Sequence, residues 1–338
     1  MDSRVRVVRH SSANANPQMQ SLQGSQSLWR KHALRACLTE SCDAVFYGIR
    51  NPQLSAGGFV PIRAFAKINL FLDVVGKRHD GYHHLVSVMQ SLEMCDDLEF
   101  YACEESIISF EVSGAADDFP LDDSNLILRA AQFLIDAYNI RQGVKIKLQK
   151  RIPMGAGLGG GSSDCAATLH GLNNLFGLDI PLPQLIDIGQ KFGADVPFCL
   201  MGGTALAQGI GEQLTPLSPH PPCYIVLACP DIHVSTGEMF RRLDLSVEHR
   251  IDHNSFIAAY KTGKISTIAE SFYNIFTPIT STIHPKIAEL IAALNKLGAI
   301  NASMTGTGST VFGYFENEND AHIACNQLDA KTFLTKPV

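Results

Sequence analysis

A glycine-rich stretch, PMGAGLGGGSSD at 153–164, is where this sequence first suggests chemistry. It lies between an alternating apolar and polar run at 144–150, typical of a strand, and a run with apolar residues at helical spacing. Glycines let a ligand approach the backbone closely, and free N–H groups at a helix start attract anions. We therefore expect a phosphate-binding loop whose residues are Pro153, Met154, Gly155, Ala156, Gly157, Leu158, Gly159, Gly160, Gly161, Ser162 and Ser163. The Ser163 hydroxyl could also contact Mg²⁺.

Other interpretations of this loop are weaker. Gly155, Gly157 and Gly160 match GxGxxG, which would indicate an NAD-dependent oxidoreductase. That motif needs an acidic residue ending a second strand about 20 residues further on, but Asp179 lies in a predicted turn between helices. A P-loop needs a lysine after its last glycine, and the sequence has none there. An ordinary helix start with flexible glycines is the alternative without a ligand.

Two charged residues elsewhere have ordinary interpretations when taken alone, and it is the family resemblance given below that makes them candidates for catalysis. Lys67 lies between Ala66 and Ile68 in RAFAKINLFLDVV, a predicted strand in which an unpaired cation would be costly. Asp195 belongs to the segment GADVP. Taken alone, Lys67 could be an exposed strand residue and Asp195 could fix the turn before Pro197. A carboxylate–lysine pair in a cleft would account for both.

The composition is that of a globular protein. Of 338 residues, 46% are hydrophobic and 18% charged, so a large core can form. The net charge of −6 argues against a nucleic-acid partner, because that binding depends on Lys and Arg. The nine cysteines form no CxxC pair and no zinc-type cluster with histidine, so we expect reduced thiols. No apolar run approaches the roughly 20 residues that cross a bilayer, and no membrane partner is expected.

The pattern of elements predicts an α+β fold, because strands and helices mix without regular βαβ alternation. Strands are expected at 84–94, 96–102 and 224–229, a helix capped by Ser124, and a loop followed by a hairpin over GADVPFCLMGGTALAQG. Residues 1–60 hold three acidic residues against seven Arg and Lys, and are expected to be a disordered or targeting leader, or an over-extended start. The Pro-rich stretch at 217–223 predicts a boundary between domains at 61–218 and 219–338. A cytoplasmic location is expected, or a plastid-type organelle if the leader is a transit peptide.

Four ordered blocks of the sequence resemble the GHMP kinases, the superfamily of galactokinase, homoserine kinase and mevalonate kinase. The glycine-rich loop is similar to the family's phosphate loop, and SMTGTGSTVF to its third motif. AKINLFLDVVGKRHDGYHHL and GADVPFCLMGGTALAQGIGEQL resemble the members that phosphorylate 4-diphosphocytidyl-2-C-methyl-D-erythritol. The resemblance implies a two-domain GHMP kinase fold, with a ribosomal-protein-like N-terminal domain that carries the phosphate loop and a ferredoxin-like C-terminal domain.

The resemblance also implies a reaction, the ATP- and Mg²⁺-dependent phosphorylation of the 2-hydroxyl of that substrate in isoprenoid precursor synthesis. Asp195 is the implied base, Lys67 its cationic partner, and Asn69 lies beside the acceptor polyol. The implied nucleotide or phosphate contacts outside the glycine-rich loop are Asn125, Lys150, Thr305, Gly306, Thr307 and Gly308. Asp164 departs from the small or neutral residue more often found there, which puts its contact with nucleotide in doubt.

Specificity is carried by GYHHL, in which Tyr82 and His83 would stack on and hydrogen-bond to a cytosine ring, with Phe240 on the ring's other side. A helix-core aromatic is the alternative for Phe240. Homoserine or mevalonate kinases are the nearest alternatives, but their acceptors offer no base to stack. A non-catalytic ligand-binding protein on the same fold is an alternative from another class. The expected partner is the small-molecule substrate alone, bound by a monomer or homodimer.

Overall fold

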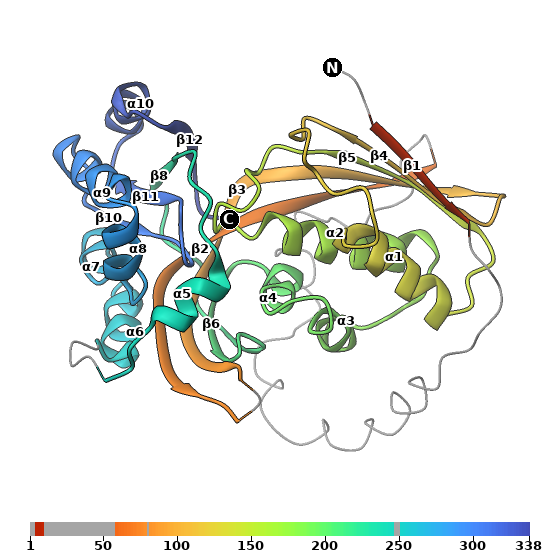
Figure 1. Cartoon of the computed structure of the whole chain (residues 1–338), viewed down its shortest axis with the longest axis horizontal. Helices are drawn as coiled ribbons and strands as arrows, with labels where there is room; N and C mark the ends of the chain where they lie inside the picture. The colour runs from red at the N-terminus through yellow and green to blue at the C-terminus, as the bar shows by residue number, and fades with distance from the viewer. Residues whose placement is uncertain (1–3, 10–57, 80, 247–250) are drawn as a thin grey trace. The chain divides into compact units, whose positions relative to one another are not determined.

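The computed structural model describes residues 4–9, 58–79, 81–246 and 251–338 (Figure 1). The chain divides into two compact units, each made of segments that are discontinuous in sequence. Of the described residues, unit 1 contains those up to Ala64, Asp96–Lys150 and Asp164–Leu185, and unit 2 contains those in Phe65–Cys95, Arg151–Ser163 and Ile186–Val338. Both units combine strands and helices, which confirms the α+β class.

The predicted domain limits at 61–218 and 219–338 stay a prediction. Of the predicted leader, residues 10–57 lie outside the described residues. Arg4–Arg9 form a strand of unit 1, β1, which pairs antiparallel with β4.

Unit 1 is a set of neighbouring strands with helices along one face (Figure 1). The strand order is β1-β4-β5-β3; β4 and β5 run parallel, and the other pairs are antiparallel. The bounds are β3 His83–Cys103, β4 Ile107–Ser113, β5 Gly143–Gln149, α1 Leu126–Ala137, α2 Gly160–Leu175 and α3 Leu182–Gly189. Side chains in β4 alternate between buried and half-buried, as expected of a sheet covered on one face.

Two local expectations for these segments are corrected. The sequence predicts Ser124 as the cap of α1, but Asn125 is the cap, because its side chain accepts a hydrogen bond from the Ile127 N–H at 2.8 Å. Ser124 instead hydrogen-bonds the Asp122 carboxylate. The separate strands expected at 84–94 and 96–102 are one strand, β3, because the chain crosses Cys95 without a turn.

Unit 2 contains a four-stranded antiparallel sheet of order β10-β11-β8-β12, with helices packed against it (Figure 1). A second group of strands consists of β2, the first part of β3, β6, β7 and β9. The strand bounds are β2 Phe59–Lys77, β6 Thr204–Gly209, β7 Gln213–Pro216, β8 Tyr224–Cys229, β9 Tyr273–Asn274, β10 Asn301–Met304, β11 Val311–Phe315 and β12 Lys331–Thr335. The helix bounds are α4 Val196–Met201, α5 Thr236–Arg242, α6 His253–Lys261, α7 Ile265–Glu270, α8 Thr277–Ile283, α9 Lys286–Lys296 and α10 Glu318–Gln327.

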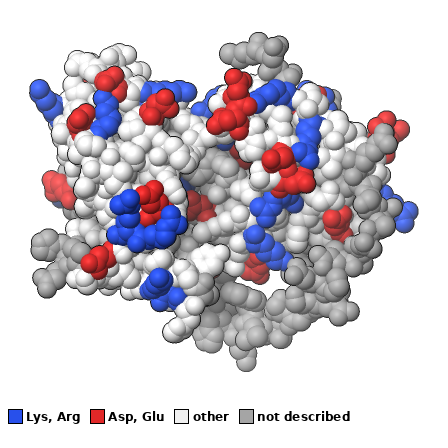
Figure 2. Space-filling view, viewed as in Figure 1, with Lys and Arg blue, Asp and Glu red and all other residues white. Residues whose placement is uncertain are grey.

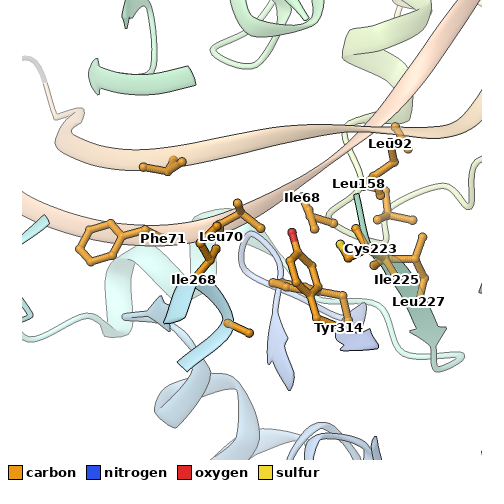
Figure 3. Packing of buried hydrophobic residues seen from close by; sticks show 14 of the residues in the cluster. Ile68, Leu70, Phe71, Leu92, Leu158, Cys223, Ile225, Leu227, Ile268 and Tyr314 are labelled. Atoms are coloured by element: carbon orange, nitrogen blue, oxygen red, sulfur yellow. The ribbon is translucent and has the colours of Figure 1, made fainter. Parts of the chain in front are cut away.

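A hydrophobic core fixes β2 within unit 2 (Figure 3). Ile68 and Leu70 of β2 are fully buried in one cluster with Ile225 of β8 and Tyr314 of β11. Burial of each such side chain contributes about 1.5–3 kcal/mol. Since successive strand residues point to opposite faces, this packing directs the intervening residue Asn69 to the other face of β2.

Charged side chains of both signs are interspersed over the face shown in Figure 2. No helix in the described ranges combines the length and apolar character required to span a membrane.

Candidate active site

The glycine-rich loop connects β5 to α2, as the sequence predicts. Gly155, Gly157 and Gly159 have φ values of 63°, 80° and 70°, in the left-handed region that favours glycine. A Cβ at Gly157 would lie 2.8 Å from the carbonyl oxygen of Thr305, so the third motif lies directly against the loop. Close packing as well as backbone conformation therefore requires glycine here.

Strand β2 supports the loop from the other side. The Lys67 N–H donates to the Leu158 carbonyl at 3.0 Å. A Cβ at Gly159 would lie 2.8 Å from Cγ of Lys67, so the aliphatic part of that lysine packs on the loop backbone. The side chains of Ala156 and Leu158 belong to the hydrophobic core and anchor the loop.

Lys67 and Asp195 form an ion pair within unit 2. Their Nζ and Oδ2 atoms are 3.2 Å apart, and the side chains are 5% and 32% exposed. Asp195 precedes α4, but its side chain makes no capping hydrogen bond, so its carboxylate is not used to fix the turn. The structure thus brings together the lysine and the aspartate expected to form a pair. The side chain of Asp195 is more accessible to solvent than that of Lys67.

Asn69 links this pair to the third motif. Its Oδ1 accepts hydrogen bonds from Lys67 Nζ at 2.9 Å, from the Thr305 hydroxyl at 3.1 Å and from the Gly306 N–H at 3.1 Å. Its Nδ2 donates to the Ser87 hydroxyl at 2.9 Å. The amide therefore holds Lys67 and the third motif in register, in addition to any contact with an acceptor.

Asn274 also holds the third motif, and the sequence analysis did not single it out. Its Nδ2 donates to the carbonyl oxygens of Met304 at 2.7 Å and Gly306 at 2.8 Å. A hydroxyl pair, Thr236 and Thr307, adds a contact of 3.1 Å between their Oγ1 atoms. Asn274 ends the short strand β9, and no local signal in the sequence marks this role.

The aromatic residues predicted to bind a base also lie in unit 2. The rings of His83 and Phe240 have centroids 4.9 Å apart at 34°, and Phe240 packs edge-on against Phe276 at 4.8 Å. Tyr82 is 61% exposed. Burial, with Lys77 acting in the same direction, lowers the pKa of His83, so its neutral ring offers one donor and one acceptor.

Other predicted contacts have their polar groups occupied by protein partners. The Asn125 amide caps α1 and donates to the Pro120 carbonyl at 2.8 Å. The Ser163 hydroxyl donates to the Phe65 carbonyl. Lys150 Nζ binds Asp96 and Asp164, within unit 1. Their contacts with nucleotide or metal stay predictions.

Family membership can now be established by comparison with known proteins. The family model for the GHMP kinases N terminal domain matches residues 125–203, and that for GHMP kinases C terminal matches 257–333. A protein of Caldicellulosiruptor saccharolyticus named 4-diphosphocytidyl-2-C-methyl-D-erythritol kinase is 41% identical over 268 residues, which are 79% of this chain and 92% of that protein. This chain belongs to the GHMP kinase family.

Two further comparisons agree with this membership. An identically named protein of Exiguobacterium sibiricum is 43% identical over 267 residues, covering 79% of this GHMP kinase and 93% of that protein. The crystal structure of a 4-(cytidine 5'-diphospho)-2C-methyl-D-erythritol kinase superposes with a TM-score of 0.71 at 31% identity, covering 82% of this chain and 99% of that one. The resemblance inferred from four sequence blocks is confirmed.

Proposed function

We propose that this GHMP kinase transfers the γ-phosphate of ATP to the 2-hydroxyl of 4-diphosphocytidyl-2-C-methyl-D-erythritol. The observation that carries the proposal is the Lys67–Asp195 ion pair, with its lysine stem packed on a glycine-rich phosphate loop. The relatives at 41% and 43% identity carry the name of this kinase, which supports the choice of acceptor.

In this proposal Asp195 is the residue that acts on the acceptor hydroxyl. In the proposed step the hydroxyl proton moves to the Asp195 carboxylate, the oxygen forms a bond to the γ-phosphorus, and the bond from that phosphorus to ADP breaks. Lys67 orients Asp195 and supplies positive charge beside the transferring group. The partial exposure of Asp195 supports this division of roles, since a base must reach its substrate.

The phosphates of ATP would bind backbone N–H groups of the glycine-rich loop near the start of α2, where unpaired donors and the helix dipole favour anions. The described residues contain no cluster of three or more acidic, His or Cys side chains able to hold a metal ion. The Ser163 hydroxyl donates its proton to the Phe65 carbonyl and keeps its oxygen lone pairs, so its contact with Mg²⁺ stays a prediction. In the proposed reaction Mg²⁺ enters bound to the nucleotide, as MgATP.

The aromatic residues support a cytidine-bearing acceptor. A pyrimidine ring can stack on His83 or Phe240, and the neutral imidazole can hydrogen-bond its edge. Neither homoserine nor mevalonate presents such a ring. These acceptors would leave a half-exposed aromatic pair without a function.

An ADP-release assay on the full chain tests the proposal. Acceptors are 4-diphosphocytidyl-2-C-methyl-D-erythritol, homoserine and mevalonate, each with MgATP. We expect turnover with the first, reduced by a factor on the order of 100 or more in Asp195→Asn. Glu111→Gln, in a partly exposed ion pair of unit 1, is the matched control and should keep full activity. Turnover with another acceptor only would refute the assignment of the substrate.

A further inference from the structure

Residues 151–163, which contain the glycine-rich loop, are bounded by two buried charged residues, Lys150 before them and Asp164 after them. Lys150 Nζ lies 2.7 Å from Oδ2 of Asp164 and 2.5 Å from Oδ2 of Asp96. The three side chains are at most 5% exposed. The proposed chemistry uses none of them, although burying charges is costly unless their geometry is good. A structural or functional contribution of these three residues must therefore offset the cost of burying them.

Each member of the cluster is fixed to a different part of unit 1. Lys150 follows β5, and its N–H donates to the Ser113 carbonyl at the end of β4 at 2.8 Å. Asp96 belongs to β3, and Asp164 lies near the start of α2. The lysine therefore ties the exit of β5 to the entry of α2, so the 13 loop residues 151–163 leave and return at fixed points.

The charges of the cluster do not balance unless one carboxyl holds a proton. Burial raises the pKa of Asp164 to about 8. Asp96 also raises this pKa, whereas Lys150 lowers it. Its Oδ1 atom has no hydrogen-bond partner among the described residues, whereas Oδ2 binds the lysine. Burial thus favours the neutral form of Asp164, whose Oδ2 accepts a hydrogen bond from Lys150.

We propose that Lys150 and Asp164, the loop-base pair, close the base of the glycine-rich loop and fix its path before nucleotide binds. They are positioning residues, and Asp164 acts through the loop without touching ATP. The inference rests on the proposed function in that the ligand of the loop is a nucleotide. Its physical basis is that ordering a glycine-rich segment on binding costs conformational entropy, which a closed base reduces in advance.

The test compares variants of the full chain. Asp164→Ala leaves Lys150 and Asp96 as a balanced ion pair, so the fold is expected to persist. Asp164→Asn keeps an oxygen acceptor for Lys150 and should restore the link. Glu111→Ala breaks the Lys145–Glu111 ion pair of the same unit, whose atoms are 2.7 Å apart, and is the control for loss of an ion pair without loop closure.

Two measurements are made: hydrogen exchange of residues 151–163 without ligand, and calorimetric titration with MgADP. For Asp164→Ala we expect loop exchange and the Kd for MgADP each to rise about tenfold, the loss expected for one hydrogen bond to a charged group. The value of kcat at saturating ATP should stay within about threefold, because the reacting groups are untouched. Asp164→Asn and Glu111→Ala should match the unmodified chain.

Several results would overturn the inference. Unchanged loop exchange in Asp164→Ala would show that the loop does not need the pair. Faster exchange throughout unit 1 would assign the pair to stability of the whole unit. An Asn variant as impaired as the Ala variant would exclude the neutral hydrogen bond. Failure of the unmodified chain to bind MgADP would refute the proposed function, while loop exchange would still decide the role of the loop-base pair.

Discussion

Replacing Asp164 by Asn should change how the stability of the protein depends on pH. Asp164 has a pKa of about 8 in the folded protein against an ordinary value of 3.8, because of burial. Between these values the folded state holds a proton that the unfolded state has lost. The free energy of unfolding therefore falls as pH rises, by up to about 1.4 kcal/mol per pH unit. The amide introduced by Asp164→Asn does not titrate, so this dependence should disappear.

The magnitude follows from the same values. Between pH 5 and pH 8 the free energy of unfolding falls by up to about 3.7 kcal/mol through this one group. The charged groups that face Asp164, Lys150 and Asp96, are present in both proteins, as are all more distant groups. Their direct contributions largely cancel in the difference between the two pH profiles. The free energy of unfolding of the variant should thus increase relative to that of the unmodified chain as pH rises.

Urea unfolding at pH 5, 6, 7 and 8 measures this difference, with the midpoint compared at equal m-value. Stability curves that run parallel for the two proteins would refute the argument that burial holds a proton on Asp164. If the variant instead becomes less stable than the unmodified chain at high pH, the Asp164 carboxylate is ionised and stabilised by Lys150. Glu111→Gln, which alters a partly exposed carboxylate, should leave the profile nearly unchanged.

Further predictions concern three positions. Gly159→Ala should impair ATP binding and stability, because φ is +70° and the new Cβ would lie 2.8 Å from Lys67 Cγ, whereas the Cβ of Gly161→Ala meets no protein atom within 4 Å and should leave stability in urea unfolding unchanged. Asn274→Ala, which removes two hydrogen bonds to the third motif, should cost about 1–3 kcal/mol in thermal or urea unfolding and lower kcat/KM. Burial lowers the pKa of His220 to about 4, so stability should fall as pH drops from about 6.5 toward 4, and His220→Gln should weaken that dependence in urea titrations.

Local sequence patterns determine several elements of this fold closely. The apolar run at 224–229 predicts β8 with the bounds that the structure has, because a buried strand is apolar on both faces. The cap of α1 was predicted one residue early, because Ser124 and Asn125 are both good caps and only the hydrogen bond to Ile127 distinguishes them. The helix α4 was predicted as a loop, since GADVPFCLM combines a glycine and a proline and is too short for a periodic pattern.

The Lys67–Asp195 pair was predicted from the family resemblance, and the cost of a cation in an apolar strand gave a further physical reason for Lys67 to have a partner. In the structure Asp195 is that partner. Asn274 could not be found this way, because its carbonyl partners lie 30 and 32 residues further along the chain and its own neighbourhood carries no unusual residue. Such contacts follow from tertiary packing, which one sequence without relatives does not reveal.

The rule that a buried cation needs a partner also applies to Lys150. Comparing Lys150 with Lys67 distinguishes two roles of a lysine–carboxylate pair. Lys150, like Lys67, is about 5% exposed and pairs with carboxylates. The carboxylates of Lys150 are at most 3% exposed, whereas that of Asp195 is 32% exposed. A base must reach its substrate, so of these two pairs it is Lys67–Asp195 that we propose for proton exchange with an acceptor. The buried cluster can instead fix the chain at both ends of the loop, and accessibility of the acid therefore distinguishes the two roles.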